Sequence, residues 1–338
     1  MRRLIIGLVA LAALLSAVAG VYYARVDERY QGYAGTEQFV EIAPGQGTRA
    51  IGRALARHGV VRDEWTFRLA VRLTRTERDL KAGEYRFASP MSAKEVAQKL
   101  ARGEVHLRPM TFPEGLTIRE MAQLFESRGF GEAEAFRSAA ADPAPVRELD
   151  PAAPDLEGYL FPETYNLPRT ATAGSLVGQM VQRFLSVFDE PLRAEAAARG
   201  VSVRQVVTLA SLVEKETAVA EERPVVAAVY LNRLAIGMPL QADPTVIYAL
   251  TRAGRYDGNL TRSTLQFDSP YNTYRYPGLP PGPIASPGRA SLEAVLRPAA
   301  VDYLYFVSRN DGSHAFATTL AEHNRNVRRW QVEFFKKN

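Results

Sequence analysis

Residues 203–217 read VRQVVTLASLVEKET, a stretch without glycine or proline that predicts a helix at the centre of the C-terminal half of the chain. On a helical wheel started at Val206, Glu216 lies at about 280°, inside the arc of the apolar side chains. Glu214 lies at the edge of that arc. Because carboxylates are rarely buried unless they are paired or used, Glu216 is a candidate functional residue.

Burial of Glu216 would raise its pKa, which suits a general acid near neutral pH. The pattern also allows a structural role, in which Glu216 pairs with Arg223 or Arg233 or caps the following helix. That helix has Pro224 in its first turn and ends at Gly237. Glu216 therefore lies at the end of one predicted helix, next to a turn from which a side chain can reach a groove.

The segment after this turn, residues 238–250, reads MPLQADPTVIYAL. Gln241, Asp243 and Thr245 occupy alternate positions, so an extended backbone would place them on one face. We expect all three to bind substrate. Asp243 is also the alternative second carboxylate; next to Glu216, its charge would raise the pKa of the glutamate further.

Residues 268–288, DSPYNTYRYPGLPPGPIASPG, predict a loop stiffened by proline. Its aromatic and amide side chains suit a carbohydrate ligand, since rings stack on sugar C–H surfaces and amides bond to hydroxyl and N-acetyl groups. We therefore expect Tyr271, Asn272 and Tyr274 to bind substrate. A proline-rich surface loop without function would have the same composition. Residues 156–165, LEGYLFPETY, have a similar character.

The composition excludes several kinds of chemistry. The 338 residues include no cysteine, which removes disulfides, thiolate nucleophiles and cysteine-based metal sites. The four histidines lack metal-ligand spacing, and neither a glycine-rich phosphate loop nor a G-x-S-x-G motif is present. We therefore predict no metal and no cofactor. The formal net charge of +5 permits an anionic partner but selects none.

The N-terminus predicts a membrane anchor. Residues 4–24 carry no charge and are long enough to span a bilayer, and Arg2 and Arg3 precede them. Positive residues favour the cytoplasmic side, so we expect a single-pass inner-membrane protein with its bulk outside the cytoplasm and no nucleic-acid partner. A cleaved signal peptide is the alternative, because residues 17–19, AVA, resemble a cleavage site that would leave Gly20 as the first residue.

The rest of the chain predicts an α+β protein. Two segments share a turn followed by a helix that starts after threonine, PGQGTRAIGRAL and PEGLTIREMAQLF; they are either a weak internal repeat or two unrelated α/β pieces. A stretch rich in alanine, proline and aspartate predicts a domain boundary. The predicted parts are a tail (1–3), a transmembrane helix (4–24), a tether (25–37), an α/β region (38–130), a linker (131–155) and a catalytic domain (156–338).

Four long motifs resemble the endolytic murein transglycosylase family, the YceG-like proteins. They are LEGYLFPETY at 156–165, the stretch from LASLVEKET to VIYAL at 209–250, YNTYRYPGLPPGPIASPG at 271–288 and LYFVSRNDGSHAFATTLAEHN at 304–324. The resemblance covers nearly the whole chain. It implies a lyase whose catalytic glutamate is the second one of E-K-E-T, Glu216.

The resemblance further implies cleavage of the β-1,4 bond between N-acetylmuramic acid and N-acetylglucosamine inside nascent peptidoglycan strands, with formation of 1,6-anhydro ends. It implies that residues 38–130 are LysM-like, that the catalytic domain is lysozyme-like in function, and that peptidoglycan synthases are possible partners. A non-catalytic, membrane-anchored scaffold that binds peptidoglycan is the alternative, and product mass distinguishes a transglycosylase from a hydrolase.

Overall fold

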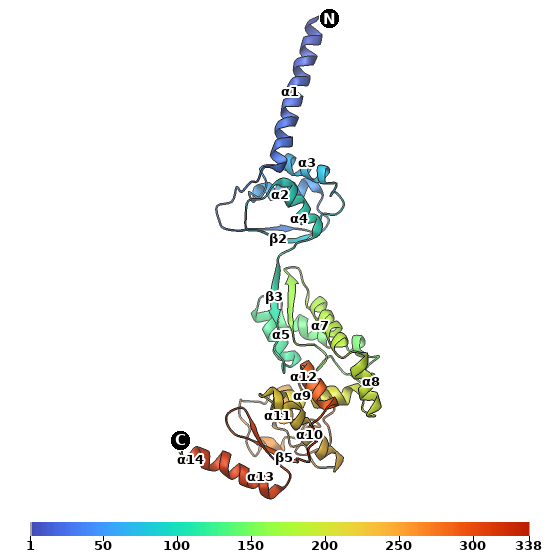
Figure 1. Ribbon diagram of the computed structural model, residues 1–338, viewed down its shortest axis with the longest axis vertical. Helices are drawn as coiled ribbons and strands as arrows, with labels where there is room; N and C mark the ends of the chain where they lie inside the picture. Colours follow the sequence, from blue (N-terminus) through green and yellow to red (C-terminus); the bar gives the residue numbers. More distant parts are fainter. Residues whose placement is uncertain (1, 338) are drawn as a thin grey trace. The chain divides into compact units, whose positions relative to one another are not determined.

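The computed structural model describes residues 2–337 and shows a mixed α+β chain with an N-terminal apolar helix (Figure 1). The chain forms two compact units. The first comprises the residues up to Pro109 together with Asn166–Ala171, and the second comprises Met110–Tyr165 and the residues from Thr172 onward. Met1, part of the predicted tail, lies outside the described residues.

Helix α1 (Arg2–Asp27) contains the predicted spanning segment. Its stretch Ala10–Asp27 has a mean hydropathy of 1.3 and is long and apolar enough to cross a membrane, a property that a signal sequence shares. The predicted tether at 25–37 differs from the structure. The helix continues to Asp27, Val26 is fully buried, and the backbone N–H of Tyr30 donates to the carbonyl of Met91 at 3.0 Å.

After α1, the first unit contains a two-stranded antiparallel sheet and three further helices, α2 to α4. Strand β1 (Gln38–Ile42) pairs with β2 (Gly83–Phe87), and Val40 lies opposite Tyr85. Helices α2 (Thr48–Arg57) and α3 (Glu64–Thr74) connect the two strands, and α4 (Ala93–Arg102) follows β2. The N-cap of α4 is a capping box between Ser92 and Glu95.

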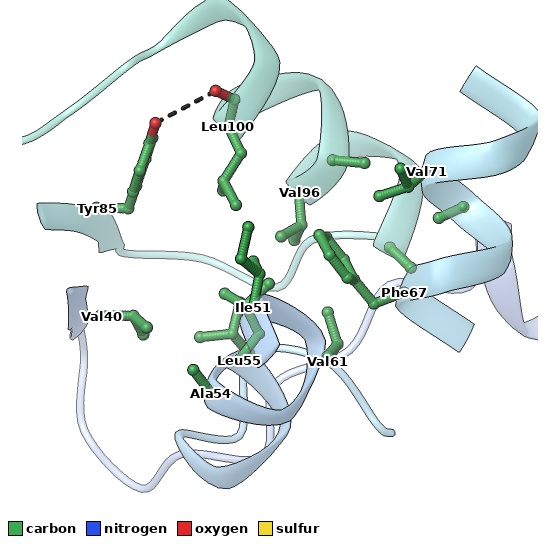
Figure 2. Close-up of a cluster of buried hydrophobic side chains, with 14 of the residues drawn as sticks. Val40, Ile51, Ala54, Leu55, Val61, Phe67, Val71, Tyr85, Val96 and Leu100 are labelled. Carbon is green, nitrogen blue, oxygen red and sulfur yellow. Dashed lines mark hydrogen bonds between the residues drawn. The ribbon is translucent and has the colours of Figure 1, made fainter. Parts of the chain in front are cut away.

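Apolar side chains from both strands and from helices α2, α3 and α4 form most of the core of this unit (Figure 2), and Val26 of α1 packs into it. Ile51 and Leu55 come from α2, one turn apart, and face Phe67 of α3 and Val96 of α4. The hydroxyl of the fully buried Tyr85 donates to the carbonyls of Lys81 and Leu100, which satisfies the only polar group of that ring.

The second unit begins inside strand β3 (Leu107–Thr111), which forms a two-stranded sheet with β4 (Thr164–Pro168). The structure differs here from the predicted boundaries. The region 38–130 is divided between the two units, and 131–155 is not a linker. Instead, its alanine-rich sequence forms a helix and a 3-10 turn with an apolar face, and Phe136, Ala140 and Val146 are fully buried.

The other elements of this unit follow in chain order. Up to residue 252 they are α5 (Ile118–Ser127), α6 (Ala133–Ala140), η1 (Ala144–Val146), α7 (Ala173–Val187), α8 (Glu190–Ala198), α9 (Val203–Glu216), η2 (Ala220–Glu222), α10 (Arg223–Ala235) and α11 (Asp243–Arg252). After it they are η3 (Thr264–Gln266), α12 (Arg289–Leu296), the antiparallel pair β5 (Tyr305–Ser308) and β6 (His314–Ala317), α13 (Leu320–Val327), η4 (Arg328–Glu333) and α14 (Phe334–Lys337).

Helix α9 is the central element of the second unit, as the sequence predicts. Eight consecutive residues, Val206–Val213, are buried, because α8, α10, α11 and α12 all pack against this helix. Ser202 begins the helix through a capping box with Gln205. The apolar stripe of α9 therefore fixes where its last residue, Glu216, lies in the fold.

Candidate active site

Glu216 is the last residue of α9 and is only partly exposed. The hydroxyl of Tyr230, a buried residue of α10, donates a hydrogen bond to its Oε1 at 3.1 Å. Burial raises the pKa of Glu216 to about 7, and the negative charge of Asp243 raises it as well, whereas the Tyr230 hydrogen bond and the charge of Arg233 lower it. This carboxyl can therefore exchange a proton near neutral pH.

The residue after Glu216 ends the helix. Thr217 has an extended backbone (φ −110°, ψ 109°), and its buried hydroxyl donates to the carbonyl of Val213 at 2.8 Å. The hydroxyl of Thr217 is thus used within α9. The chain turns away directly behind the Glu216 carboxyl.

Asp243 lies at the start of α11 and is exposed. Its Oδ1 accepts a hydrogen bond from the Tyr274 hydroxyl at 2.6 Å. Burial and the Asp243 carboxylate both raise the pKa of Tyr274, so this phenol stays a donor. The site therefore combines a carboxyl whose pKa burial raises to about 7 with a second carboxyl group that accepts a hydrogen bond from a phenol.

Arg233 of α10 connects the site to the surrounding backbone. It is 7% exposed and donates to the carbonyls of Leu304 at 2.6 Å and Leu240 at 2.7 Å. Its guanidinium lies 5.5 Å from the ring centroid of Tyr305. Arg233 brings positive charge near Glu216 while it fixes β5 and the segment before α11, so it positions the site.

The predicted structural role for Glu216, an ion pair with Arg223 or Arg233, has no support among the ion pairs of residues 2–337. Arg223 pairs instead with Glu214, at 3.2 Å. The other Glu214 oxygen accepts from the Gly288 N–H at 3.0 Å and the Ser291 hydroxyl at 2.8 Å. Glu214 is thus a fully bonded carboxylate that joins α9 to α12, whereas Glu216 has no such ion pair in the described part of the chain.

Two of the predicted substrate residues lie inside the protein. Thr245 is fully buried, donates to the carbonyl of Ala242 at 2.7 Å and lies 2.9 Å from the hydroxyl of Thr273. Asn272 is also fully buried and donates to the carbonyls of Leu265 and Phe267. Both side chains have internal partners. They hold the loop and do not present polar groups to a ligand.

The expectation that residues 241–245 are extended is wrong. Asp243 and Pro244 form the first turn of α11, a position that proline and an acidic residue favour. Gln241 lies just before this helix in a left-handed conformation (φ 48°) and is exposed, so it does not share a face with Asp243 and Thr245.

Tyr271 belongs to a different cluster from Glu216. Its ring centroid lies 5.0 Å from that of Tyr248 on α11. The Tyr248 hydroxyl donates to the buried Glu157 at 3.2 Å, and Glu157 also accepts from the N–H of Ile118 at 3.0 Å. Burial raises the pKa of Glu157 to about 8. The structure therefore contains a second buried acid.

Some site residues escaped the sequence reasoning. Tyr230 was not singled out, although it lies in the helix after Glu216, and Arg233 was considered only as an ion-pair partner. Glu157 lies in the motif at 156–165, and nothing in the local sequence indicates that it is a buried acid. Among residues 2–337, no group of three or more histidine, aspartate or glutamate side chains is placed to hold a metal ion.

Three comparisons with known proteins agree with this description. The sequence model of the YceG-like family matches residues 40–329. A protein of Bacillus subtilis (strain 168) named endolytic murein transglycosylase is 33% identical over 303 residues, which cover 85% of this chain and 82% of the relative. One of the same name from Streptococcus pneumoniae (strain D39) is 32% identical over 323 residues, which cover 85% of this chain and 57% of the relative.

Among solved structures, the 2.6 Å crystal structure of a putative yceG-like protein of Listeria monocytogenes matches with a TM-score of 0.59 and 32% sequence identity. The match covers 86% of this chain and 99% of the Listeria chain. The family match extends over both compact units, from β1 to η4. On these grounds, the chain belongs to the YceG-like family.

Proposed function

We propose that this chain is a lytic murein transglycosylase, which cleaves the β-1,4 bond between N-acetylmuramic acid and N-acetylglucosamine within nascent peptidoglycan strands. The assignment to this class of lyases is supported by the family and by the names of its relatives. The observation that carries the mechanism is the single carboxyl at Glu216, whose pKa burial raises to about 7, with Asp243 beside it.

Glu216 acts first as an acid and then as a base. Protonated, it donates to the glycosidic oxygen, and the bond from that oxygen to C1 of the muramic residue breaks. Ionised, it takes the proton from the C6 hydroxyl of the same sugar, whose oxygen closes on C1 to form the 1,6-anhydro ring. The proton returns to Glu216, and no water is consumed. Hydrolases need two carboxyl groups for this task, whereas here the nucleophile belongs to the substrate.

Asp243 has a supporting role. Positive charge develops at C1 in the transition state, and a fixed carboxylate stabilises it without reorganisation. The Tyr274 hydroxyl holds Asp243 at 2.6 Å in one orientation. In that orientation Asp243 accepts a hydrogen bond from the N-acetyl N–H, which turns the acetamido carbonyl toward C1.

The N-terminal part determines where this reaction takes place. We propose that α1 is an uncleaved single-pass anchor of the inner membrane with the N-terminus in the cytoplasm, so that both units lie where new strands are made. There, cleavage terminates strand elongation, and peptidoglycan synthases are candidate partners. The order of strand, two helices and strand from β1 to β2 supports a LysM-like part within residues 38–130, which binds N-acetylglucosamine polymers.

Cleavage of purified glycan strands by the wild type and by Glu216→Gln tests the proposal. The variant keeps the shape of the side chain and an acceptor for Tyr230 but loses the acid. We expect strand binding by both proteins and cleavage by the wild type only. Equal binding without cleavage by either would support a scaffold instead, and cleavage by the variant would rule out Glu216 as the acid.

A further inference from the structure

The last turn of α11 carries an arginine that is held by two aromatic rings. The guanidinium of Arg252 lies 5.8 Å from the ring centroid of Tyr248 and 5.6 Å from that of Tyr271. Its Nη1 donates to the Tyr248 hydroxyl at 3.4 Å, and the residue is exposed. Stacking on two rings reduces the rotamer freedom of this side chain while its edge stays open to solvent.

No carboxylate within ion-pair distance of Arg252 is found in the described part of the chain. Glu157 lies behind Tyr248, but burial raises its pKa to about 8, so it is mostly neutral at pH 7. Asp155 is the other acidic group whose charge acts on Arg252, and it is partly exposed. The cluster therefore presents an oriented guanidinium without a bound carboxylate.

The cluster of Arg252, Tyr248 and Tyr271 lies some distance from Glu216 and Asp243, but the same helix and the same loop contribute to both places. Arg252 is nine residues after Asp243, about 14 Å farther along the axis of α11. The loop that includes Tyr271 and Tyr274 joins the two places, because Tyr274 bonds to Asp243 and Tyr271 packs against Tyr248. A strand cut in its interior extends past the broken bond on both sides, so it covers a separation larger than one sugar ring.

We propose that Arg252, held on Tyr248 and Tyr271, is a subsite that binds a carboxylate of the glycan strand several sugars from the cleaved bond. This inference rests on the proposed function. The muramic sugar supplies the ligand chemistry in two forms: its lactyl group ends in a free carboxylate, or it is joined to a peptide that carries carboxylates of its own. A planar guanidinium binds either form through two parallel hydrogen bonds.

The test compares the wild type with Arg252→Ala on three substrates. They are peptide-bearing strands, strands stripped of peptide by an amidase, and stripped strands whose lactyl carboxylates have been converted to amides. Loss of a charge-assisted hydrogen bond outside the reacting centre raises KM by roughly tenfold to a hundredfold and leaves kcat unchanged. A rise in KM on peptide-bearing strands alone identifies the peptide as the source of the carboxylate, and a rise on stripped strands alone identifies the lactyl carboxylate. A rise on both substrates shows that Arg252 binds either form.

Two further variants serve as controls. Arg262→Ala removes another exposed arginine of the same unit and should leave KM unchanged on all three substrates. Arg252→Lys keeps the charge but not the planar stacking, and should recover only part of the affinity. An equal KM for wild type and Arg252→Ala on both carboxylated substrates, or the same rise on the amidated strands, would overturn the subsite. If the wild type cleaves none of the strands, the proposed function itself fails.

Discussion

Replacement of Glu216 by glutamine should stabilise the second unit, by an amount that depends on pH. The pKa of Glu216 is about 7 in the folded chain against a reference of 4.5, because the ionised form is disfavoured by burial. A raised pKa means that the wild type has its full stability below about pH 4.5 and loses stability as the pH rises toward 7. Each pKa unit corresponds to about 1.4 kcal/mol, so the loss reaches about 3 kcal/mol at pH 8 but only about 1 kcal/mol at pH 5.

Since Glu216 is partly exposed, solvent screening reduces the change between these two pH values to roughly 2 kcal/mol. Urea unfolding of the full chain in detergent at pH 5 and pH 8 measures it. A Trp65→Phe background leaves Trp330, in the second unit, as the only tryptophan. Glu148→Gln removes an exposed carboxylate and is the control. If Glu216→Gln shifts the free energy of unfolding equally at both pH values, the carboxyl is not kept neutral by burial.

Three further predictions concern the same site. Tyr230→Phe removes the hydrogen bond that lowers the pKa of Glu216, so the fall in kcat on the alkaline side should move to higher pH; an unchanged profile would mean that the phenol does not act on the acid. Asp243→Asn removes a charge that raises the pKa of Glu216, so the alkaline fall in kcat should move to lower pH, and the maximum kcat should drop. A move to higher pH would show that the charge of Asp243 does not raise the pKa of Glu216. Glu214→Ala leaves the largely buried Arg223 without its closest carboxylate and should lower the free energy of unfolding in urea by roughly 3 kcal/mol. A decrease below about 1 kcal/mol would show that the Glu214–Arg223 ion pair does not stabilise the second unit.

The sequence was sufficient to predict helix α9 and the burial of Glu216. Helix α9 has a continuous apolar face, and a wheel places Glu216 on that face without any knowledge of the fold. Helices α2 and α5 were also predicted from a local signal, the turn and the threonine that stand at the start of each. These features depend on residues that are close together in the chain.

Features that depend on distant segments were not predicted. Thr245 looks like a ligand-binding residue until its partner Thr273, 28 positions later, is known. Asn272 gives its amide to backbone carbonyls, which no side-chain pattern reveals. The start of α11, in contrast, could have been predicted from the local sequence. Asp243-Pro244 is a helix-start signal, but the alternation of polar residues at 241–245 suggested an extended segment instead.

The central claim is that Glu216 uses a hydroxyl of the substrate, not water, as the nucleophile. Digestion of glycan strands in water enriched in oxygen-18, followed by mass spectrometry of the new ends, tests it most directly. The wild type should release 1,6-anhydro ends that are lighter than reducing ends by one water and contain no oxygen-18, and Glu216→Gln should release none. Reducing ends that carry oxygen-18 would show that the enzyme is a hydrolase and would contradict this account.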